Sequence, residues 1–335
     1  MAADLAGLLA RLACSGLAHL QPTLHSVRLC LSSYLASGSL QTLHASAQSG
    51  DLSVGSLRAL PALRELTLSG PGPWLLPREA SLPPNLSQLH LRSNGEETLP
   101  PQLAHLSSLR EVRLEARYLG EEALAPLTGL TGLLPLHLDS AHGDDPSLPA
   151  GLGELRSLQG FTLLVQQGFR LPEEPLEGQA AGALCSALPR WTALTSLELT
   201  PLPGLMGPPH TGGVLQRLRS FAWRRGFDED LAELPPAGPW LSNLQQLTAQ
   251  PMLLARSLQQ LGAARQLVEL HIAGCGPEAA AGSAAVLRCA AGLPALRRMV
   301  LDAGSLPREA VAAVLELQRR RPALSIELGG EPATP

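Results

Sequence analysis

The sequence predicts an α/β solenoid with a curved parallel β-sheet on its concave face and helices, 3₁₀ turns and loops on its convex face. The first observation is composition: 45% of the 335 residues are apolar, and by count leucine supplies 74 of them while isoleucine supplies only two. The second observation is a short leucine pattern that returns at nearly constant steps. A core built from one branched side chain at a fixed period indicates a single packing arrangement used many times.

The repeated unit is LxxLxL, and its clearest copy is Leu86, Leu89 and Leu91, followed by Asn94. From Leu40 onward, successive copies start 23, 23, 23, 24, 25, 36, 24, 26, 23 and 29 residues apart. Chance matches to this pattern are frequent in a leucine-rich chain, but a near-constant step over this many copies is not expected by chance. The repeat therefore predicts a solenoid in which each unit buries its core against its neighbours.

The pattern resembles the leucine-rich-repeat family over roughly residues 20–328. Early copies such as LPPQLAHLSSLREVRL, from Leu99, look like plant-type repeats of 23–24 residues. Later copies with alanine-rich runs, such as PEAAAGSAAVLRCAAGL from Pro277, look like ribonuclease-inhibitor-type repeats. The resemblance implies an intracellular repeat protein and an asparagine at the ninth position of each repeat, where its side chain satisfies neighbouring backbone groups. Only Asn94 keeps that residue, and Cys275 looks like a substitute for it.

Each LxL segment reads as a half-buried strand, because alternate side chains point to opposite faces. The leucines point inward and the residue between them points to the concave face. The return path carries leucines such as Leu103 and Leu106 at helical or 3₁₀ spacing. Proline at the start of these segments, at Pro100, Pro149 and Pro307, is compatible with a first helical turn.

Three regions are predicted along the chain. Residues 1–23 form a helical cap, residues 24–328 form about thirteen repeats, and residues 329–335 form a disordered tail. An insertion near 164–193 lengthens one step to 36 residues, and we expect a loop followed by a short helix near 179–188. The last helix is expected over 307–320, with four apolar side chains mainly inward: Val311, Val314, Leu315 and Leu317. Trp223 occupies an inward leucine position and is predicted to be core.

Charge and cysteine content exclude several classes of function. The formal net charge of −4 gives no basic stripe for nucleic acid and no clustered positive charge for a membrane surface. No run of 18 apolar residues exists, so no membrane span is predicted, and the start of the chain does not read as a signal peptide. The five cysteines are scattered and never paired as CxxC, which favours a reducing compartment and buried thiols. We expect a cytoplasmic protein, with the axoneme, nucleus or plastid as alternatives.

The chain has no lysine. Enzymes that rely on a P-loop lysine, a kinase strand lysine or a Schiff-base lysine are therefore excluded. HExxH and GxSxG are absent, and the nine histidines and five cysteines show no metal-ligand spacing. We expect neither catalysis, nor a metal, nor a cofactor.

The residues between the inward leucines form a column across the concave face. In chain order they are Arg28, His44, Thr67, His90, Arg113, His137, Thr162, Glu198, Ala222, Thr248, His271, Val300 and Ser325. Because neighbouring strands lie about 4.8 Å apart, three of them, His90, Arg113 and His137, should form a ladder. With the flanking outward residues, the candidate partner-binding set is Gln88, His90, Arg92, Glu111, Arg113, Glu115, His137 and Asp139.

Two interpretations of this mixed-charge set stand side by side. A concave face must be polar because it faces water, and its charges can simply neutralise one another. Alternatively, the set is a partner footprint centred on Arg113, with the acidic flanks selecting a basic or polar partner surface.

The leading functional hypothesis is a non-catalytic scaffold, monomeric by itself, that binds a partner protein on the concave face. An alternative is a substrate-recognition subunit of a ubiquitin ligase, because the last repeat, LQRRRPALSIEL, looks like those of F-box proteins. However, residues 1–23 do not match an F-box. A regulatory component of a signalling or axonemal complex would have the same fold, and fold alone does not give function.

Overall fold

The computed structural model divides the chain into two compact units, residues 1–190 and residues 191–335. It describes these residues: 27–30, 41–47, 57, 60–70, 76, 79–95, 98–140, 148–165, 179–200, 215–223, 238–250, 254–255, 257–274, 280–302 and 307–329. The cap predicted over residues 1–23, the predicted loop around 166–175, Cys275 and residues 330–335 all lie outside these ranges.

In the first unit, every repeat contributes one strand to a sheet. The strands are β1 (Val27–Cys30), β2 (Thr42–Ala47), β3 (Glu65–Gly70), β4 (Gln88–Ser93), β5 (Glu111–Ala116), β6 (Pro135–Ser140) and β7 (Gly160–Val165). From β2 onward, consecutive strands pair in parallel. Leu89 lies between Leu66 and Val112 in register, so equivalent repeat positions stack on one another.

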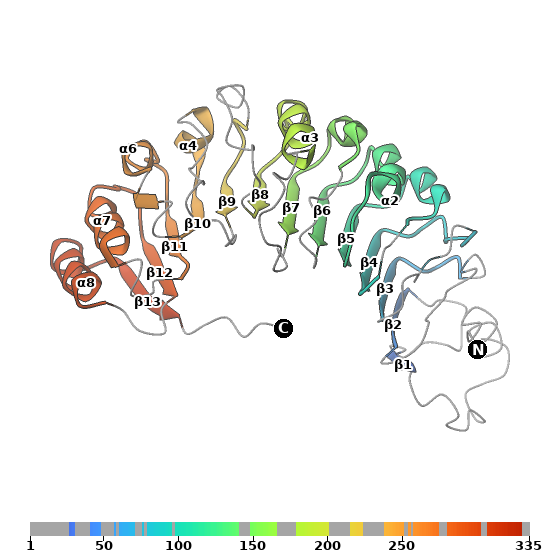
Figure 1. The fold of residues 1–335 in the computed structure, drawn as a ribbon, viewed down its shortest axis with the longest axis horizontal. Helices are drawn as coiled ribbons and strands as arrows, with labels where there is room; N and C mark the ends of the chain where they lie inside the picture. Colours follow the sequence, from blue (N-terminus) through green and yellow to red (C-terminus); the bar gives the residue numbers. More distant parts are fainter. Residues whose placement is uncertain are drawn as a thin grey trace, which may run out of the picture. The chain divides into compact units, whose positions relative to one another are not determined.

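The return segments of the first unit all lie on one side of its sheet (Figure 1). They are η2 (Pro101–His105), α2 (Glu121–Leu124), η3 (Ala125–Gly129), η4 (Ala150–Glu154), α3 (Gln179–Ala187) and η5 (Leu188–Arg190). Their leucines Leu103, Leu127 and Leu152 are buried against the strand leucines. Pro100 and Pro149 stand one residue before their 3₁₀ turns, at the N-cap.

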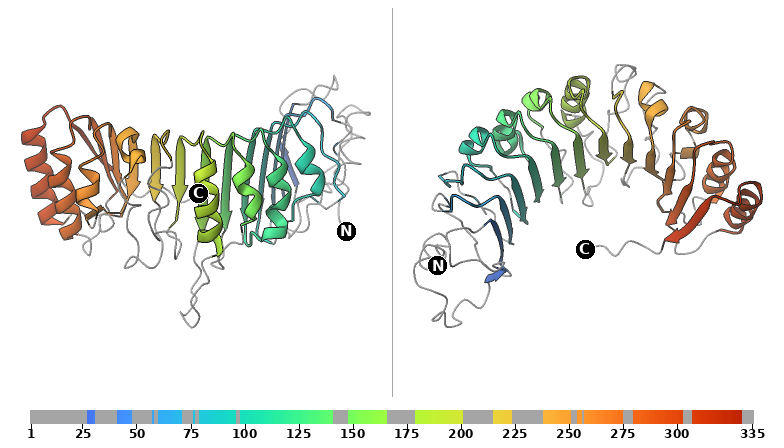
Figure 2. Two further views of the ribbon diagram at one scale, coloured as in Figure 1. Left: turned by 90° about the horizontal axis from the view of Figure 1, so that it is seen from above. Right: turned by 180° about the vertical axis from the view of Figure 1, so that it is seen from behind.

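The second unit repeats this plan with longer helices near its end (Figure 2). Its strands are β8 (Ser196–Leu199), β9 (Ser220–Trp223), β10 (Gln246–Ala249), β11 (Glu269–Ile272), β12 (Arg298–Asp302) and β13 (Ser325–Gly329), all paired in parallel. Its helices are α4 (Pro239–Asn243), α6 (Leu258–Leu261), α7 (Ala280–Ala290) and α8 (Arg308–Arg320). Trp223 is buried as predicted, and Phe221 packs 6.0 Å from it and 5.5 Å from Trp240 between ring centroids.

Strand β1 differs from the prediction because it pairs with β2 in the antiparallel direction. Only eleven residues separate Cys30 from Thr42. A parallel connection needs a crossover of a dozen or more residues, whereas an antiparallel pair can be joined by a short one. The step from Leu24 to Leu40 is 16 residues, which is too short for a full repeat of the kind that follows.

The last repeat is displaced by two residues from its predicted register. Val300 pairs with Glu327, so Glu327 and not Ser325 continues the column on the sheet face. The inward face of α8 was predicted only in part, because Leu317 is buried and Val314 half-buried as expected but Val311 and Leu315 are exposed. Ala310, Ala313 and Leu317 are buried, whereas Val311 is 41% exposed and Leu315 is 51% exposed. Small alanines fill this face because α8 packs directly on the similarly small-residue helix α7.

The buried polar residue at the end of a strand lies one position earlier than the ninth repeat position, where Asn94 was expected to fill this role. Asn94 is exposed, whereas Ser93 is 4% exposed and its Oγ accepts a hydrogen bond from the Gly95 N–H at 3.0 Å. Ser140 occupies the equivalent place, and its Oγ donates to the Arg117 carbonyl. Two units of stacked, parallel LxxLxL strands with leucine-bearing return segments make the chain an α/β leucine-rich-repeat solenoid.

Candidate functional site

All eight predicted site residues lie on three neighbouring strands. Strand β4 carries Gln88, His90 and Arg92, strand β5 carries Glu111, Arg113 and Glu115, and strand β6 carries His137 and Asp139. They alternate with buried Leu89, Leu91, Val112, Leu114, Leu136 and Leu138, so all eight share the face of the sheet opposite the leucine core. We call this surface the β4–β6 face.

The register brings the predicted ladder together. His90 pairs with Arg113, and Arg113 pairs with His137. One row further along the strands, Arg92 pairs with Glu115 and Glu115 pairs with Asp139. The two rows therefore place cationic and anionic groups within reach of one another on adjacent strands.

Glu115 is the centre of the β4–β6 face. Its Oε1 lies 2.6 Å from Arg113 Nη2, 2.7 Å from Arg113 Nε and 3.3 Å from His90 Nε2. Its Oε2 lies 3.3 Å from Arg92 Nε. One carboxylate therefore contacts three side chains that come from its own strand and from the preceding one. Sequence reasoning found all four residues but did not show that Glu115 organises the others.

These contacts lower the pKa of Glu115 from 4.5 to about 2. The hydrogen bond with His90 is the largest cause, burial opposes it, and the positive charge of Arg113 adds to the lowering. The carboxylate is therefore ionised at any physiological pH, and it remains available to hold the two arginines.

The rest of the β4–β6 face divides into exposed and recessed groups. Gln88 and Glu111 are exposed at the beginning of β4 and β5. His137 and Asp139 are half-buried, and the Nε2 atom of His137 and the Oδ1 atom of Asp139 are shielded from solvent. Recessed polar groups of this kind set the shape of the surface, while the exposed ones set what it presents to a partner.

A second polar group, which sequence reasoning did not assemble, lies on the sheet face of the second unit. Arg298 Nη1 is 2.8 Å from Glu269 Oε1, and Arg298 Nη2 is 2.8 Å from Glu327 Oε2. His271 Nε2 is 2.7 Å from Asp302 Oδ2. His271 belongs to the predicted column, but the register error at β13 hid the contribution of Glu327.

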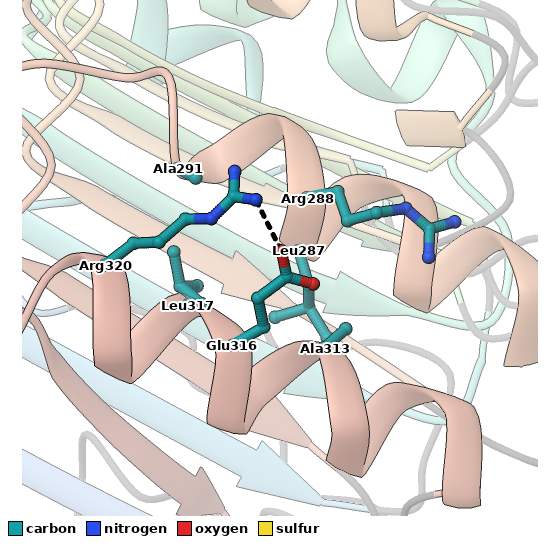
Figure 3. A pocket seen from close by; sticks show the side chains of 7 residues that line it. All are labelled: Leu287, Arg288, Ala291, Ala313, Glu316, Leu317 and Arg320. Carbon is teal, nitrogen blue, oxygen red and sulfur yellow. Dashed lines mark ion pairs between the residues drawn. The ribbon is translucent and has the colours of Figure 1, made fainter.

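A shallow cleft lies between α7 and α8 in the second unit (Figure 3). Its apolar lining includes Leu287, Ala313 and Leu317, and the Glu316 carboxylate pairs with Arg320 at 2.6 Å beside it. Leu287 and Leu317 are almost fully buried. The cleft is thus the packing seam between two successive helices of the solenoid.

Within the described ranges, no three histidine, cysteine or acidic side chains come together as a metal site. The Cys185 and Cys289 thiols are free and half-buried, and burial raises the pKa of each. Among the helices that the structure describes, none is long and apolar enough to cross a membrane.

Comparison with models of protein families and with curated proteins gave no match. Two solved plant structures are similar in part. One is the leucine-rich-repeat ectodomain of the membrane receptor kinase GASSHO1/SCHENGEN3 from Arabidopsis thaliana in complex with CASPARIAN STRIP INTEGRITY FACTOR 2 (16% identity, TM-score 0.37, covering 88% of this chain and 39% of that one). The other is the plant peptide hormone receptor RGFR1 in complex with RGF2 (14% identity, TM-score 0.36, covering 85% and 58%). The chain thus spans less than two thirds of either protein.

Proposed function

We propose that this protein is a non-catalytic interaction scaffold that binds a partner protein through the β4–β6 face. The observation that carries the proposal is the Glu115 centre, where one recessed carboxylate holds two half-exposed arginines in fixed positions. Arginine is enriched among the residues that dominate binding energy. Side chains that are already held in place lose less entropy on binding than free ones.

The neighbouring strands extend this surface. Thr67 on β3 and Thr162 on β7 continue the column with small, partly exposed polar side chains. A stable interface buries about 800 Å² on each partner, or roughly 20–30 residues, whereas eight residues define the β4–β6 face. We therefore expect the footprint to extend from β4–β6 onto β3 and β7. The proposal includes a cytoplasmic location, which the scattered cysteines of the sequence, none of them in a CxxC motif, support.

The test is a comparison of three purified baits in extract of the native cells, read out by mass spectrometry. The baits are the unaltered protein, the double variant Arg113→Glu with His137→Ala, and Arg288→Glu as a control. Arg288 is exposed on α7, outside the β4–β6 face. Circular dichroism first establishes that both variants keep their fold, as surface substitutions normally do.

The expected result is a protein that binds the unaltered bait and Arg288→Glu but is lost from the double variant. A photo-crosslinking residue in place of Gln88 should then form a covalent adduct with that protein, because Gln88 lies at the exposed border of the face. Retention of every captured protein by the double variant would place binding on another surface. Capture of ubiquitin-ligase components would favour the substrate-recognition alternative.

A further inference from the structure

On the β4–β6 face, the balance of charge among the exposed side chains differs from the balance among all its side chains. Its formal charges are two arginines against three carboxylates, with histidines taken as neutral. However, the Glu115 side chain is only 17% exposed, while Arg92 is 59% exposed and Arg113 is 47% exposed. Asp139 is half-buried and its Oδ1 atom is shielded from solvent. The most exposed charges are therefore those of Arg92, Arg113 and Glu111, while Glu115 and Asp139 are more recessed.

The recessed carboxylate occupies only part of each guanidinium. An arginine has five N–H donors. Glu115 contacts Nε of Arg92, and Nε and Nη2 of Arg113. The other donors belong to side chains about half exposed, and their planar geometry suits a further carboxylate. Glu115 thus holds the two arginines while leaving donor capacity for a ligand.

We propose that the partner segment that binds the β4–β6 face is acidic, and that its side-chain carboxylates contact Arg92 and Arg113. This inference rests on the proposed function and adds the chemistry of the partner. It differs from the sequence-based interpretation that the acidic flanks select a basic or polar partner surface, because Glu115, the central acidic residue, is paired with Arg92 and Arg113. Glu111, the exposed carboxylate on the same strand, weakens binding of an acidic partner and limits it to segments that avoid this end of β5.

The probes are two fluorescein-labelled peptides of twelve residues, one alternating glutamate with serine and the other alternating lysine with serine. Binding to the full chain is measured by fluorescence anisotropy at low and at physiological ionic strength. The variants are Arg113→Glu, Arg92→Glu and Glu111→Gln. The matched control is Arg156→Glu, which changes the net charge as Arg113→Glu does but lies beyond η4, at a side chain 74% exposed.

We expect the glutamate peptide to bind and the lysine peptide to bind at least tenfold more weakly. Arg113→Glu and Arg92→Glu should each weaken binding of the glutamate peptide about tenfold, which corresponds to about 1.4 kcal/mol. Arg156→Glu should change it less than twofold. Glu111→Gln should strengthen it, and added salt should weaken it because the arginines are exposed.

Three outcomes overturn the inference: tighter binding of the lysine peptide, no binding of the glutamate peptide at millimolar concentration, or equal loss in Arg113→Glu and Arg156→Glu. These outcomes are distinguishable from failure of the proposed function. If the lysine peptide binds more tightly but the double variant still fails to capture a cellular protein, the β4–β6 face is the binding surface and the proposed preference for acidic partners is wrong. If the glutamate peptide binds at Arg113 but the double variant retains every captured cellular protein, the preference for acidic ligands is supported and the proposed scaffold function is wrong.

Discussion

At the scale of single residues, Glu115 shows how a repeat fold turns alternation into a site. The alternation of the LxL strand places every other side chain on the sheet face, and the parallel register then places His90 and Arg92 beside β5. Glu115 satisfies both of them together with Arg113. Its pKa of about 2 measures how strongly the folded state favours the ionised form.

Glu115 should therefore contribute to stability in a pH-dependent way. Its pKa is lowered on folding, so its contribution is fully present above its ordinary value of 4.5 and is lost as the pH falls toward about 2. We expect Glu115→Gln to destabilise the protein at pH 7 by at most about 3 kcal/mol, since one pKa unit corresponds to about 1.4 kcal/mol. Urea unfolding followed by circular dichroism at pH 7, 4 and 2.5 measures this difference in unfolding free energy, which should become steadily smaller as the pH is lowered.

The control for this measurement is Glu111→Gln, a change of the same type at an exposed position on the same strand. It should shift the unfolding midpoint much less than Glu115→Gln at pH 7. A difference between Glu115→Gln and the unaltered protein that stays constant from pH 7 to pH 2.5 would contradict the role assigned to the ionised carboxylate.

The placement of the eight candidate residues on one face of the sheet was predictable at this scale, but their contacts with one another were not. Alternation fixes which side chains face solvent, and all eight predicted residues lie on the expected strands. Which carboxylate recedes and which arginine stays exposed depends on rotamers and on packing across strands, which periodicity does not encode. In contrast, Ser93 rather than Asn94 is buried at the end of β4 because Ser93 continues the inward series of Leu89 and Leu91.

At the scale of elements, the return segments of the first unit pack so closely that one of them requires glycine. A Cβ atom added to Gly129, the last residue of η3, would lie 2.9 Å from both the Cβ and the carbonyl oxygen of Ala104 in η2. Because backbone cannot move aside like a flexible side chain, one 3₁₀ turn would have to shift. Of the two turns, η2 directly precedes β5 and η3 directly precedes β6, so the stacked turns lead into two strands that are themselves paired.

Substituting this glycine should therefore be costly. We expect Gly129→Ala to lower the free energy of unfolding by about 1–3 kcal/mol, the usual cost of overpacking. Gly120→Ala is the matched control, because a Cβ there has no neighbour within 4 Å. Thermal unfolding of both variants checks this, and a loss in Gly120→Ala as large as in Gly129→Ala would contradict the packing argument.

Elements inside the regular repeats were predictable, and α8 was predicted to within one residue, but the direction of β1 and the register of β13 were predicted incorrectly. A 23-residue step is long enough to return the chain to a parallel neighbour, whereas the 16-residue step before Leu40 is not, and β1 reverses direction. For α8, counting large apolar residues placed Leu317 correctly but Val311 and Leu315 incorrectly. Its exposed Val311 and Leu315 lie on a side of the terminal helix that no following helix among the described residues covers.

At the scale of the whole molecule, the division into two units falls within the longest repeat step, the 36 residues from Leu158 to Leu194. Each unit is held by contacts between sequence neighbours, as in other repeat proteins. In the second unit, Arg321 joins the last repeat to the one before it. Its guanidinium donates to four carbonyl oxygens between the end of α7 and the start of β12, those of Ala290, Leu293, Pro294 and Leu296.

Removing the Arg321 side chain should consequently lower the stability of the second unit's last repeats alone. In Arg321→Ala, the Leu296 carbonyl loses its arginine donor, whereas the Ala290 and Leu293 carbonyls keep backbone N–H donors. A buried carbonyl left unsatisfied costs about 1–3 kcal/mol. We expect faster amide hydrogen exchange over residues 280–329 and unchanged exchange over 98–140, because repeats are coupled mainly to their neighbours. Arg320→Ala, which removes an exposed ion pair with Glu316, is the control and should leave both regions unchanged. Equal acceleration over residues 98–140 would mean that the chain unfolds as one cooperative body and that stability is not local to each unit.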